Sequence, residues 1–389
     1  MSFKTRMSVL LLSTPVLAFV LVGGLMGNEQ TSGDRLYPHL RVFDDVVELV
    51  MHNYVGEVQI DKAMDGAMRG LADGLDPDSA YLNTTQVRAI EAGETLPEGD
   101  VGIELTRRYY LYVIATRDAS PALKAGLRTA DAIRAIDGRP TRDMSVFEGT
   151  RLLRGKPGTK VTLTIVRSGG DPQEIALVRE KAAGPLVTSR LMDSVGYLRI
   201  ASFRDGAVEE LRKHAADLAK NGAKSLIVDV RRTAEGPLEN GIAAARLFIK
   251  SGTLAIKSGR GKPDTREPVA ARAGDGTIEL PTAVLVTTGT SGPAELFIAA
   301  LKDNKRADLV GERTLGRAGL QKLVKLPEGR GLWLTYARYL TPAGDPIQGR
   351  GLEPTVPVEE PDVEFGAPAP EKDPILDTAL ERLKVKAAA

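Results

Sequence analysis

Two uninterrupted apolar runs in the second half of the chain constrain its fold more than any other feature. They are "SLIVDVR" at residues 225–231 and "TAVLVTT" at residues 282–288. Strands that are apolar on both faces are typical of a sheet covered by helices on both sides. Amphipathic helical patterns alternate with these runs, and two later strands, "LVKLPEG" and "GLWLTYARYLTP", are expected to pair with each other. We therefore predict an α/β core with a mixed sheet over residues 183–360.

Short β-like runs separated by turn residues dominate residues 97–182, with one helix expected at residues 141–153. Within them, "SPALKAGLRTADAIRAIDGRP" strongly resembles the core of a PDZ domain. The resemblance implies a loop whose backbone N–H groups bind a peptide's terminal carboxylate while the peptide adds a strand beside it. In this chain that loop is Gly99, Asp100, Val101, Gly102 and Ile103, of which the last four are the candidate peptide-binding residues.

Asp100 departs from the PDZ pattern, because a glycine is commoner at its position. Its negative charge would lie near the expected carboxylate site, which weakens the expectation of tight carboxylate capture. Ala130, where the pattern usually has glycine, is a smaller departure. A purely structural β-rich domain is the alternative interpretation, since a fold alone does not prove binding.

The remaining segments outside the first thirty residues are expected to be mainly helical. Apolar residues recur at helical spacing from Leu40 to Val50, a second short helix is expected at 62–71, and "GLDPDSAYLN" supplies turn signals. We therefore predict a small helical module over residues 31–95. Residues 361–389 are expected to form a Pro-rich linker and a final amphipathic helix, "PILDTALERLKV".

Residues 1–30 have the order of a secretory signal. Lys4 and Arg6 precede an uncharged run from Met7 to Asn28. The run is long enough to span a bilayer and lacks a clean A-x-A site, so an uncleaved signal anchor and a cleaved signal peptide both remain open. A buried core helix is a third alternative. We predict export to the periplasmic or cell-envelope side, with anchoring to the inner membrane.

Composition excludes several classes of function. The 52 Lys and Arg residues nearly balance the 51 Asp and Glu residues, so no overall charge favours nucleic acid. The chain has no cysteine, which excludes disulfides, thiol nucleophiles and thiolate metal sites. Its three histidines, His39, His52 and His214, are far apart in sequence and form no metal-binding pair. We expect neither a metal nor a cofactor.

The order of these segments resembles the C-terminal processing (tail-specific) peptidase family, whose members carry a PDZ domain. The resemblance covers about residues 36–385 and rests on several motifs, among them "GLDPDSAYL", "VGYLRIASF", "SLIVDVR", "VGERTLG" and "YLTPAGDPIQGRGLEP". The last motif is especially specific: Tyr339, Thr341, Pro342, Gly344, Ile347, Gln348, Gly349, Gly351 and Pro354 all match. The resemblance implies a serine endopeptidase that cleaves near protein C-termini.

That family works with a Ser nucleophile, a Lys base, an assisting Glu and an oxyanion hole of backbone N–H groups. Its turn motif reads Gly, small, small, Ser, small, small, Glu, and aligning Gly289 and Glu295 puts Gly292 at the nucleophile position. A downstream motif, which falls on Gly311, Glu312, Gly316 and Gln321, puts Arg317 at the base position. Glycine has no side chain with which to attack, and arginine stays protonated in proteins.

The expected oxyanion region departs from the family in the same direction. The residue after the nucleophile position is Pro293, which has no N–H to donate. Where the family has Asn-Asn-Pro-Gly-Gly, this chain has "RTAEG", which brings Glu235 and Gly236 to the second donor loop. Glu235 would place a negative charge near the site where an oxyanion develops.

Two interpretations of the turn remain open. Gly292, Pro293 and Glu295 suit the N-cap, first and third positions of a helix, so a cap explains them without catalysis. Alternatively, Ser291 could replace the missing nucleophile with a base among Lys302, Lys305, Lys322 and Lys325, although a shift of one residue turns a side chain by roughly 100°.

The leading prediction is therefore a pseudo-peptidase that binds or regulates peptide tails or partner proteins. It would work as a homodimer or in a complex with an active relative. The alternative is an active serine-type endopeptidase with a rearranged Ser/Lys site.

Overall fold

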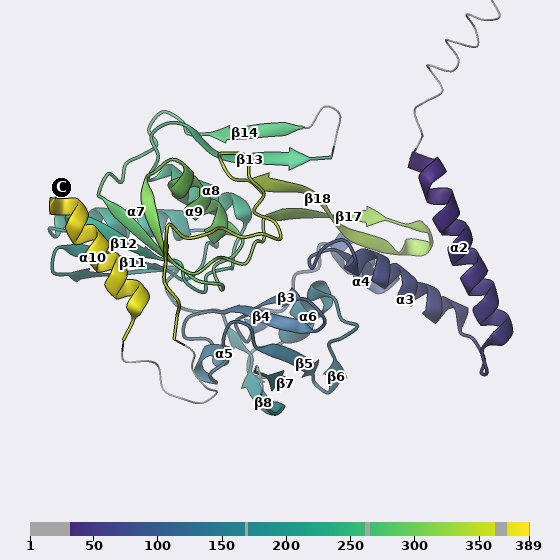
Figure 1. Ribbon diagram of the computed structural model, residues 1–389. Helices are drawn as coiled ribbons and strands as arrows, with labels where there is room; N and C mark the ends of the chain where they lie inside the picture. The colour runs from purple at the N-terminus through teal and green to yellow at the C-terminus, as the bar shows by residue number, and fades with distance from the viewer. Residues whose placement is uncertain (1–31, 168–169, 261–264, 362–371, 389) are drawn as a thin grey trace, which may run out of the picture. The chain divides into compact units, whose positions relative to one another are not determined.

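The structure is a computed structural model that describes residues 32–167, 170–260, 265–361 and 372–388 (Figure 1). The chain divides into two compact units, Met1–Ala67 and Met68–Ala389. The segment predicted as a signal or anchor, residues 1–30, lies outside the described residues, as does most of the Pro-rich linker. In the part of the chain that is described, no helix has both the length and the apolarity needed to cross a membrane.

The first unit contains helix α2 (Ser32–Asn53) and the start of helix α3 (Ile60–Asp73). The apolar stripe predicted from the sequence lies on α2, and its members Leu40, Phe43, Val46 and Val50 are all exposed. The helix therefore forms as the apolar periodicity indicates.

The PDZ segment forms an antiparallel sheet with its own apolar core. Its strands run in the order β3-β4-β5-β7-β8, with β6 beside β5. The bounds are β3 (Ile103–Arg107), β4 (Leu111–Thr116), β5 (Ala132–Ile136), β6 (Arg139–Pro140), β7 (Lys160–Val166) and β8 (Gln173–Val178). Helix α5 (Pro121–Lys124) follows β4, and a two-stranded ribbon of β2 (Gly99–Asp100) and β9 (Glu180–Lys181) closes the segment.

Helix α6 (Val146–Leu153) is shorter than the helix predicted at residues 141–153. Its N-cap is Ser145, whose hydroxyl accepts the N–H of Glu148. Thr141 instead follows β6, and its hydroxyl donates to the carbonyl of Ile133. The helix begins late because these side-chain hydrogen bonds stabilise a turn before it.

The predicted mixed sheet of the α/β core is confirmed. Its strands run in the order β10-β11-β12-β15-β16-β19, in which β10 and β11 are antiparallel and all other pairs are parallel. The bounds are β10 (Val187–Met192), β11 (Val195–Ile200), β12 (Ser225–Asp229), β15 (Thr282–Val286), β16 (Ala307–Gly311) and β19 (Val356–Pro357). Strands β12 and β15 are the two apolar runs, and every residue in both is buried.

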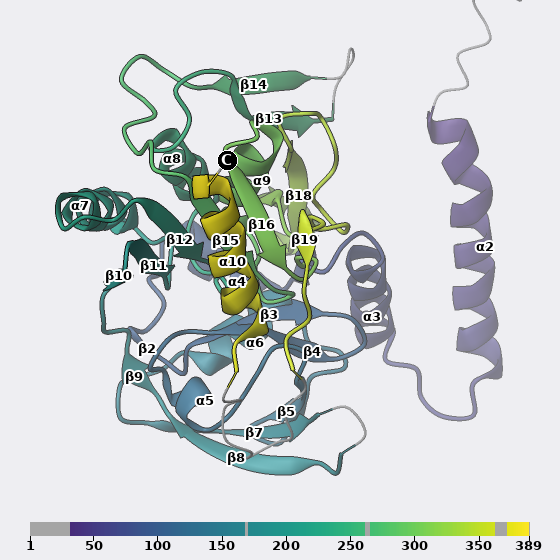
Figure 2. The same cartoon turned by 60° about the vertical axis from the view of Figure 1, so that its left-hand side comes forward.

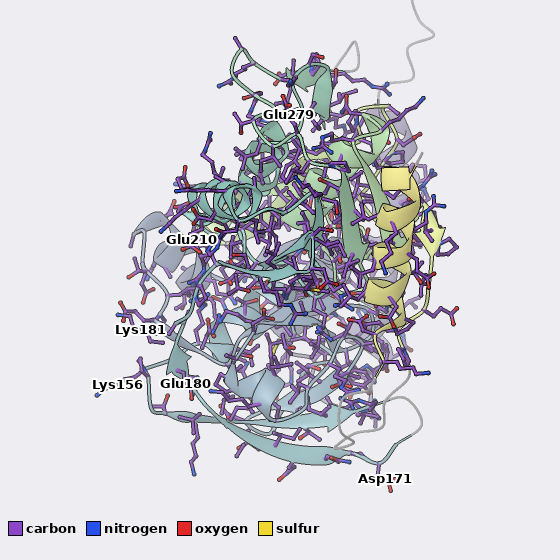
Figure 3. All side chains as sticks on the ribbon, turned by 90° about the vertical axis from the view of Figure 1, so that its left-hand side faces the viewer. Lys156, Asp171, Glu180, Lys181, Glu210 and Glu279 are labelled. Carbon is purple, nitrogen blue, oxygen red and sulfur yellow. The ribbon has the colours of Figure 1, made fainter. Side chains whose placement is uncertain are left out.

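Helices cover both faces of this sheet, as Figure 2 shows. Leu226 and Val228 of β12 pack in a core with α7 (Ala207–Lys220), α8 (Leu238–Arg246) and α9 (Pro293–Asp303). Ile227 points to the opposite face, where α10 (Pro374–Ala388) packs. Glu210 of α7, labelled in Figure 3, accepts the N–H groups of Leu186 and Val187 at 2.9 Å and so holds this helix against β10.

A second sheet of the core includes a strand from the segment expected to be helical. Its order is β1-β18-β13-β14, with β17 also paired to β18. The bounds are β1 (Ala80–Leu82), β13 (Thr253–Gly259), β14 (Arg266–Ala270), β17 (Gly319–Lys325) and β18 (Gly331–Leu340), with a 3-10 turn, η1 (Pro327–Gly329), before β18. Strands β17 and β18 pair as predicted, and the pair is antiparallel, but β17 begins and ends earlier than the predicted "LVKLPEG", whose last residues form η1.

Residues 31–95 are therefore not a single helical module. Strand β1 pairs with β18, with Ala80 opposite Trp333, and helix α4 (Thr84–Glu91) packs nearby. The boundary between the two compact units falls after Ala67, within α3. The apolar pattern of three residues in β1 is too short to indicate a strand without its partner.

Candidate functional site

Three loops meet at the carboxyl ends of the neighbouring parallel strands β12, β15 and β16, the usual place for a site in such a sheet. Hydrogen bonds tie them together. The Ser291 N–H donates to the Thr233 carbonyl at 3.0 Å, and the Leu315 N–H donates to the Thr290 carbonyl at 3.2 Å. The hydroxyl of Thr290 donates to the carbonyl of Val230 at 2.9 Å. The turn singled out in the sequence therefore lies at the centre of this edge.

Gly292 forms the turn between β15 and α9 with φ 61° and ψ −122°. It is the N-cap of α9, Pro293 is the first helical residue and Glu295 is the third, as the sequence predicts for a cap. A Cβ atom at Gly292 would lie 3.3 Å from the carbonyl oxygen of Ala234. Sharp strand-to-helix turns of this strained kind present nucleophilic side chains in hydrolases. The turn has that form, and it carries no side chain.

Glu295 brings the two positions of interest together. Its side chain is fully buried, and its Oε2 atom accepts the N–H of Gly292 at 3.1 Å and the N–H of Arg317 at 2.7 Å. These two nitrogens therefore lie within about 6 Å of each other. Oε1 accepts the N–H of Gly316 at 2.7 Å and the hydroxyl of Thr314. Burial raises the pKa of Glu295, and these four hydrogen bonds oppose the rise.

Arg317 is held by an acidic partner that sequence reasoning did not identify. Its guanidinium forms an ion pair with the buried carboxylate of Asp78 at 2.8 Å, and Nη1 lies 3.5 Å from the Leu105 carbonyl. Burial alone would lower the pKa of Arg317, but Asp78 and Glu104 raise it above its ordinary value. This side chain can therefore donate hydrogen bonds and positive charge, and it cannot accept a proton.

The start of α9 has no N–H group left for an oxyanion. The N–H of Ser291 is bonded to Thr233, the N–H of Gly292 is bonded to Glu295, and Pro293 has none. On the facing loop, the Glu235 carboxylate lies 3.6 Å from Arg204 and 3.9 Å from Arg117. Glu235 therefore brings a negative charge to this loop. The next residue, Gly236, has φ 124°.

Ser291 is fully buried, and its hydroxyl has no hydrogen-bond partner among the described residues. The four lysines considered as a base for Ser291 either contact other groups or lie beyond the far end of α9. Lys305 follows the far end of α9, an eleven-residue helix about 16 Å long. Lys302 Nζ donates to the Glu353 carbonyl, Lys322 lies over the ring of Tyr336, and Lys325 pairs with Glu91.

Gln321 lies in β17 rather than beside Gly292. Its side-chain amide donates to the hydroxyl of Thr335 at 3.1 Å, and the N–H of Thr335 donates to the Ser79 hydroxyl at 3.3 Å. Of the predicted site residues, Gly292, Glu295 and Arg317 therefore share one carboxylate, while Gln321 belongs to a neighbouring network. The described part of the chain contains no group of three His, Asp or Glu side chains that could hold a metal ion.

The predicted peptide-binding loop forms a small cavity between β3 and α6. Val101, Gly102 and Ile103 line it with Thr150 and Leu153. Charged side chains complete the lining: Asp100, Glu104, Arg117, Arg154 and Glu235. Burial raises the pKa of Glu104 to about 7; Glu235 and Asp100 add to the rise, while Arg317 and Arg154 oppose it. Arg117 and Glu104 were not predicted from the sequence, because no local pattern distinguishes them.

A PDZ domain joined to a helix-covered mixed sheet, with a buried glutamate beneath a strand-to-helix turn, defines a PDZ-containing peptidase fold. The sequence matches the PDZ domain over residues 99–177 and peptidase family S41 over residues 194–358. It is 32% identical over 340 residues to the carboxy-terminal-processing protease of Bartonella bacilliformis, a similarity that covers 86% of this chain and 77% of that protein. The chain therefore belongs to the C-terminal processing peptidase family.

Two further similarities agree with this assignment. The chain is 30% identical over 374 residues to the carboxy-terminal processing protease CtpA of Bacillus subtilis, covering 93% of this chain and 79% of that protein. Among solved structures, the photosystem II D1 C-terminal processing protease matches with a TM-score of 0.68 and 27% identity. That match covers 80% of this chain and 86% of the other.

Proposed function

We propose that this chain is a catalytically inactive member of its family that binds or regulates extended peptide tails or partner proteins. The observation that carries the proposal is the shared contact of Glu295 with the backbones of Gly292 and Arg317. This contact supports the register in which a glycine and an arginine stand where the family has its nucleophile and its base.

The losses act on one mechanism and reinforce one another. A Ser hydroxyl needs a positioned base, and the base must be able to lose its proton. In the proposed register, Gly292 has no hydroxyl at the nucleophile position. Arg317 places a guanidinium at the base position, and its ion pair with Asp78 favours the protonated form. Removing even one oxyanion donor typically lowers kcat by about 10²–10³-fold, and Pro293 supplies no such donor.

The PDZ domain supports the binding part of the proposal. Among the described strands β3 pairs only with β4, so its other edge, which faces α6, can accept an added strand beside the Leu105 carbonyl that Arg317 contacts. We further propose that the protein lies on the periplasmic or envelope side of the inner membrane and is anchored by its N-terminal segment. It would act there as a homodimer or with an active relative.

Labelling with a fluorophosphonate tests the proposal. The purified chain is incubated with the reagent beside an active serine hydrolase, and adducts are located by mass spectrometry. We expect no adduct on the chain under conditions that label the hydrolase completely. An adduct on Ser291 would favour the alternative, an active endopeptidase with a rearranged site.

A further inference from the structure

We infer that the PDZ groove of this chain, the cavity between β3 and α6, binds an internal segment of a peptide and not a free C-terminal carboxylate. The inference rests on the peptide binding proposed above and names the class of ligand. It follows from the position of one carboxylate of the protein itself, that of Asp100.

The Asp100 side chain occupies the anion position of the loop. It is buried, and its Oδ1 atom accepts the N–H of Gly102 at 2.7 Å. Gly102 has φ 73°, and a Cβ atom there would lie 2.3 Å from Cβ of Ser120, so the loop requires glycine. A backbone N–H that such a loop would offer to a peptide's carboxylate is therefore already bonded to the loop's own side chain.

The nearby cations are also engaged by Asp100. The Arg117 guanidinium donates to both of its carboxylate oxygens, at 2.6 Å and 3.1 Å. Arg154 lies 3.8 Å from Oδ2, and Arg117 is further shared with Glu235 at 3.9 Å. A peptide's terminal carboxylate would therefore lie beside the carboxylate of Asp100, and the nearby arginines already pair with that group. Like charges placed side by side strongly disfavour binding.

The rest of the groove suits a segment with N–H donors and no terminal charge. The outer edge of β3 provides backbone groups for an added strand, although the Leu105 carbonyl already lies 3.5 Å from Arg317 Nη1. Glu235 lines the cavity, and its buried Oε2 atom lies 3.6 Å from Arg204 Nε but accepts no hydrogen bond from the described residues. A backbone amide of a strand that continues past the loop could donate a hydrogen bond to this atom, whereas a carboxylate could not.

Matched peptide arrays test the inference with the full chain. Overlapping fifteen-residue segments of bacterial envelope proteins are prepared twice, with a free C-terminal carboxylate and with a carboxamide. The dissociation constants of the strongest binders are then measured for both forms by fluorescence polarisation. For the unaltered chain we expect the two forms of each peptide to agree within about twofold.

Substitution of Asp100 provides the second arm. Asp100→Gly frees the Gly102 N–H and Arg117, so free carboxylates should bind at least about tenfold more tightly than carboxamides. If the glycine variant does not fold, Asp100→Asn takes its place. It removes the charge but keeps an acceptor for Gly102, and it should shift the ratio in the same direction. Asp143→Gly, an exposed aspartate of the same domain, removes the same charge outside the groove and should leave the ratio unchanged.

The possible failures are distinct. A preference of the unaltered chain for free carboxylates by about tenfold or more would overturn the inference and leave the proposed peptide binding intact. Absence of binding to both peptide forms would overturn the proposed peptide binding and the inference with it. An unchanged ratio in the folded Asp100→Gly variant would show that Asp100 does not determine the ligand class.

Discussion

Gly292 and Arg317 lie in backbone positions that suit the serine and lysine expected from the family's motifs in the proposed register. The positive φ of Gly292 is the strained conformation expected where a turn presents a nucleophile, and glycine adopts it without steric cost. The backbone N–H of Arg317 donates a hydrogen bond to Glu295, while its side chain forms an ion pair with Asp78. The proposed register therefore requires a difference in two side chains and none in the arrangement of the backbone.

Restoring both side chains should therefore create activity. We expect Gly292→Ser combined with Arg317→Lys and Pro293→Ala to cleave a quenched fluorescent tail peptide, because these changes supply a hydroxyl, a titratable base and an N–H. Gly292→Ser alone should remain inactive, since arginine cannot take the proton. The matched control is Gly292→Ala with the other two changes. Equal rates in the triple variant and this control would contradict the inherited geometry.

Glu104, on the strand that faces the groove, should make stability depend on pH. Its pKa is about 7 in the folded protein, mainly through burial, and about 4.5 in the unfolded chain. The folded state therefore holds a proton that the unfolded state has lost, and stability should fall as pH rises from about 4.5 to about 7. The full shift would correspond to about 3 kcal/mol, and solvent screening of this half-buried group reduces it.

Glu104→Gln should remove this dependence. Urea unfolding of the variant and the parent at pH 5 and pH 7.5 should show the variant gaining relative stability at the higher pH. Glu174→Gln, on an exposed position of β8, is the control. A relative stability of Glu104→Gln that is the same at both pH values would contradict the assignment.

Glu295 joins helix α9 to the loop after β16 through three hydrogen bonds, and a fourth caps its own helix at Gly292. Glu295→Gln keeps one oxygen and turns an amide NH₂ toward N–H groups of the loop. Each buried donor left without a partner costs roughly 1–3 kcal/mol. We expect lower stability and faster hydrogen exchange at the amides of Gly316 and Arg317.

Hydrogen-exchange mass spectrometry checks this prediction. Glu381→Gln, an exposed change on α10, serves as the control because it alters charge equally and lies outside the loop. Unchanged exchange at residues 316–317 in Glu295→Gln would show that the glutamate does not hold the two elements together.

The elements predicted correctly from the sequence have strong local patterns. Strands β12 and β15 are continuous apolar runs, and α9 begins at the Gly-Pro signal after β15. Strands β1, β10, β13 and β14 were not predicted, because short or partly exposed strands depend on distant partners, as β1 depends on β18. Local periodicity contains no information about such pairing.

The same distinction applies to the site. The register of Gly292 and Arg317 stays a prediction from two motifs with fixed spacing, and the structure brings both backbones to the Glu295 carboxylate. Their partners could not be predicted: Asp78 lies far from Arg317 in sequence, and Arg117 lies outside the loop that it neutralises. Long-range ion pairs depend on how the chain folds back, and a single sequence does not reveal it.

Within the unit from Met68 to Ala389, the PDZ domain and the core are connected by charged contacts at the site. Arg317 of the core reaches the carbonyl of Leu105 in β3, and Arg199 pairs with Asp118 at 3.0 Å. Arg117 lies between Asp100 of the PDZ loop and Glu235 of the core. Arg317 and Glu235 of the core therefore both contact the PDZ domain, which suits the proposed binding role.

The most direct test of the proposed inactivity is the cleavage of unfolded casein and quenched tail peptides by the unaltered chain. Release of fluorescence and of peptide fragments is followed over a long incubation beside the Ser291→Ala variant. We predict that the unaltered chain and Ser291→Ala both give no cleavage above buffer. Cleavage by the unaltered chain that Ser291→Ala abolishes would contradict the account and establish an active endopeptidase with a rearranged site.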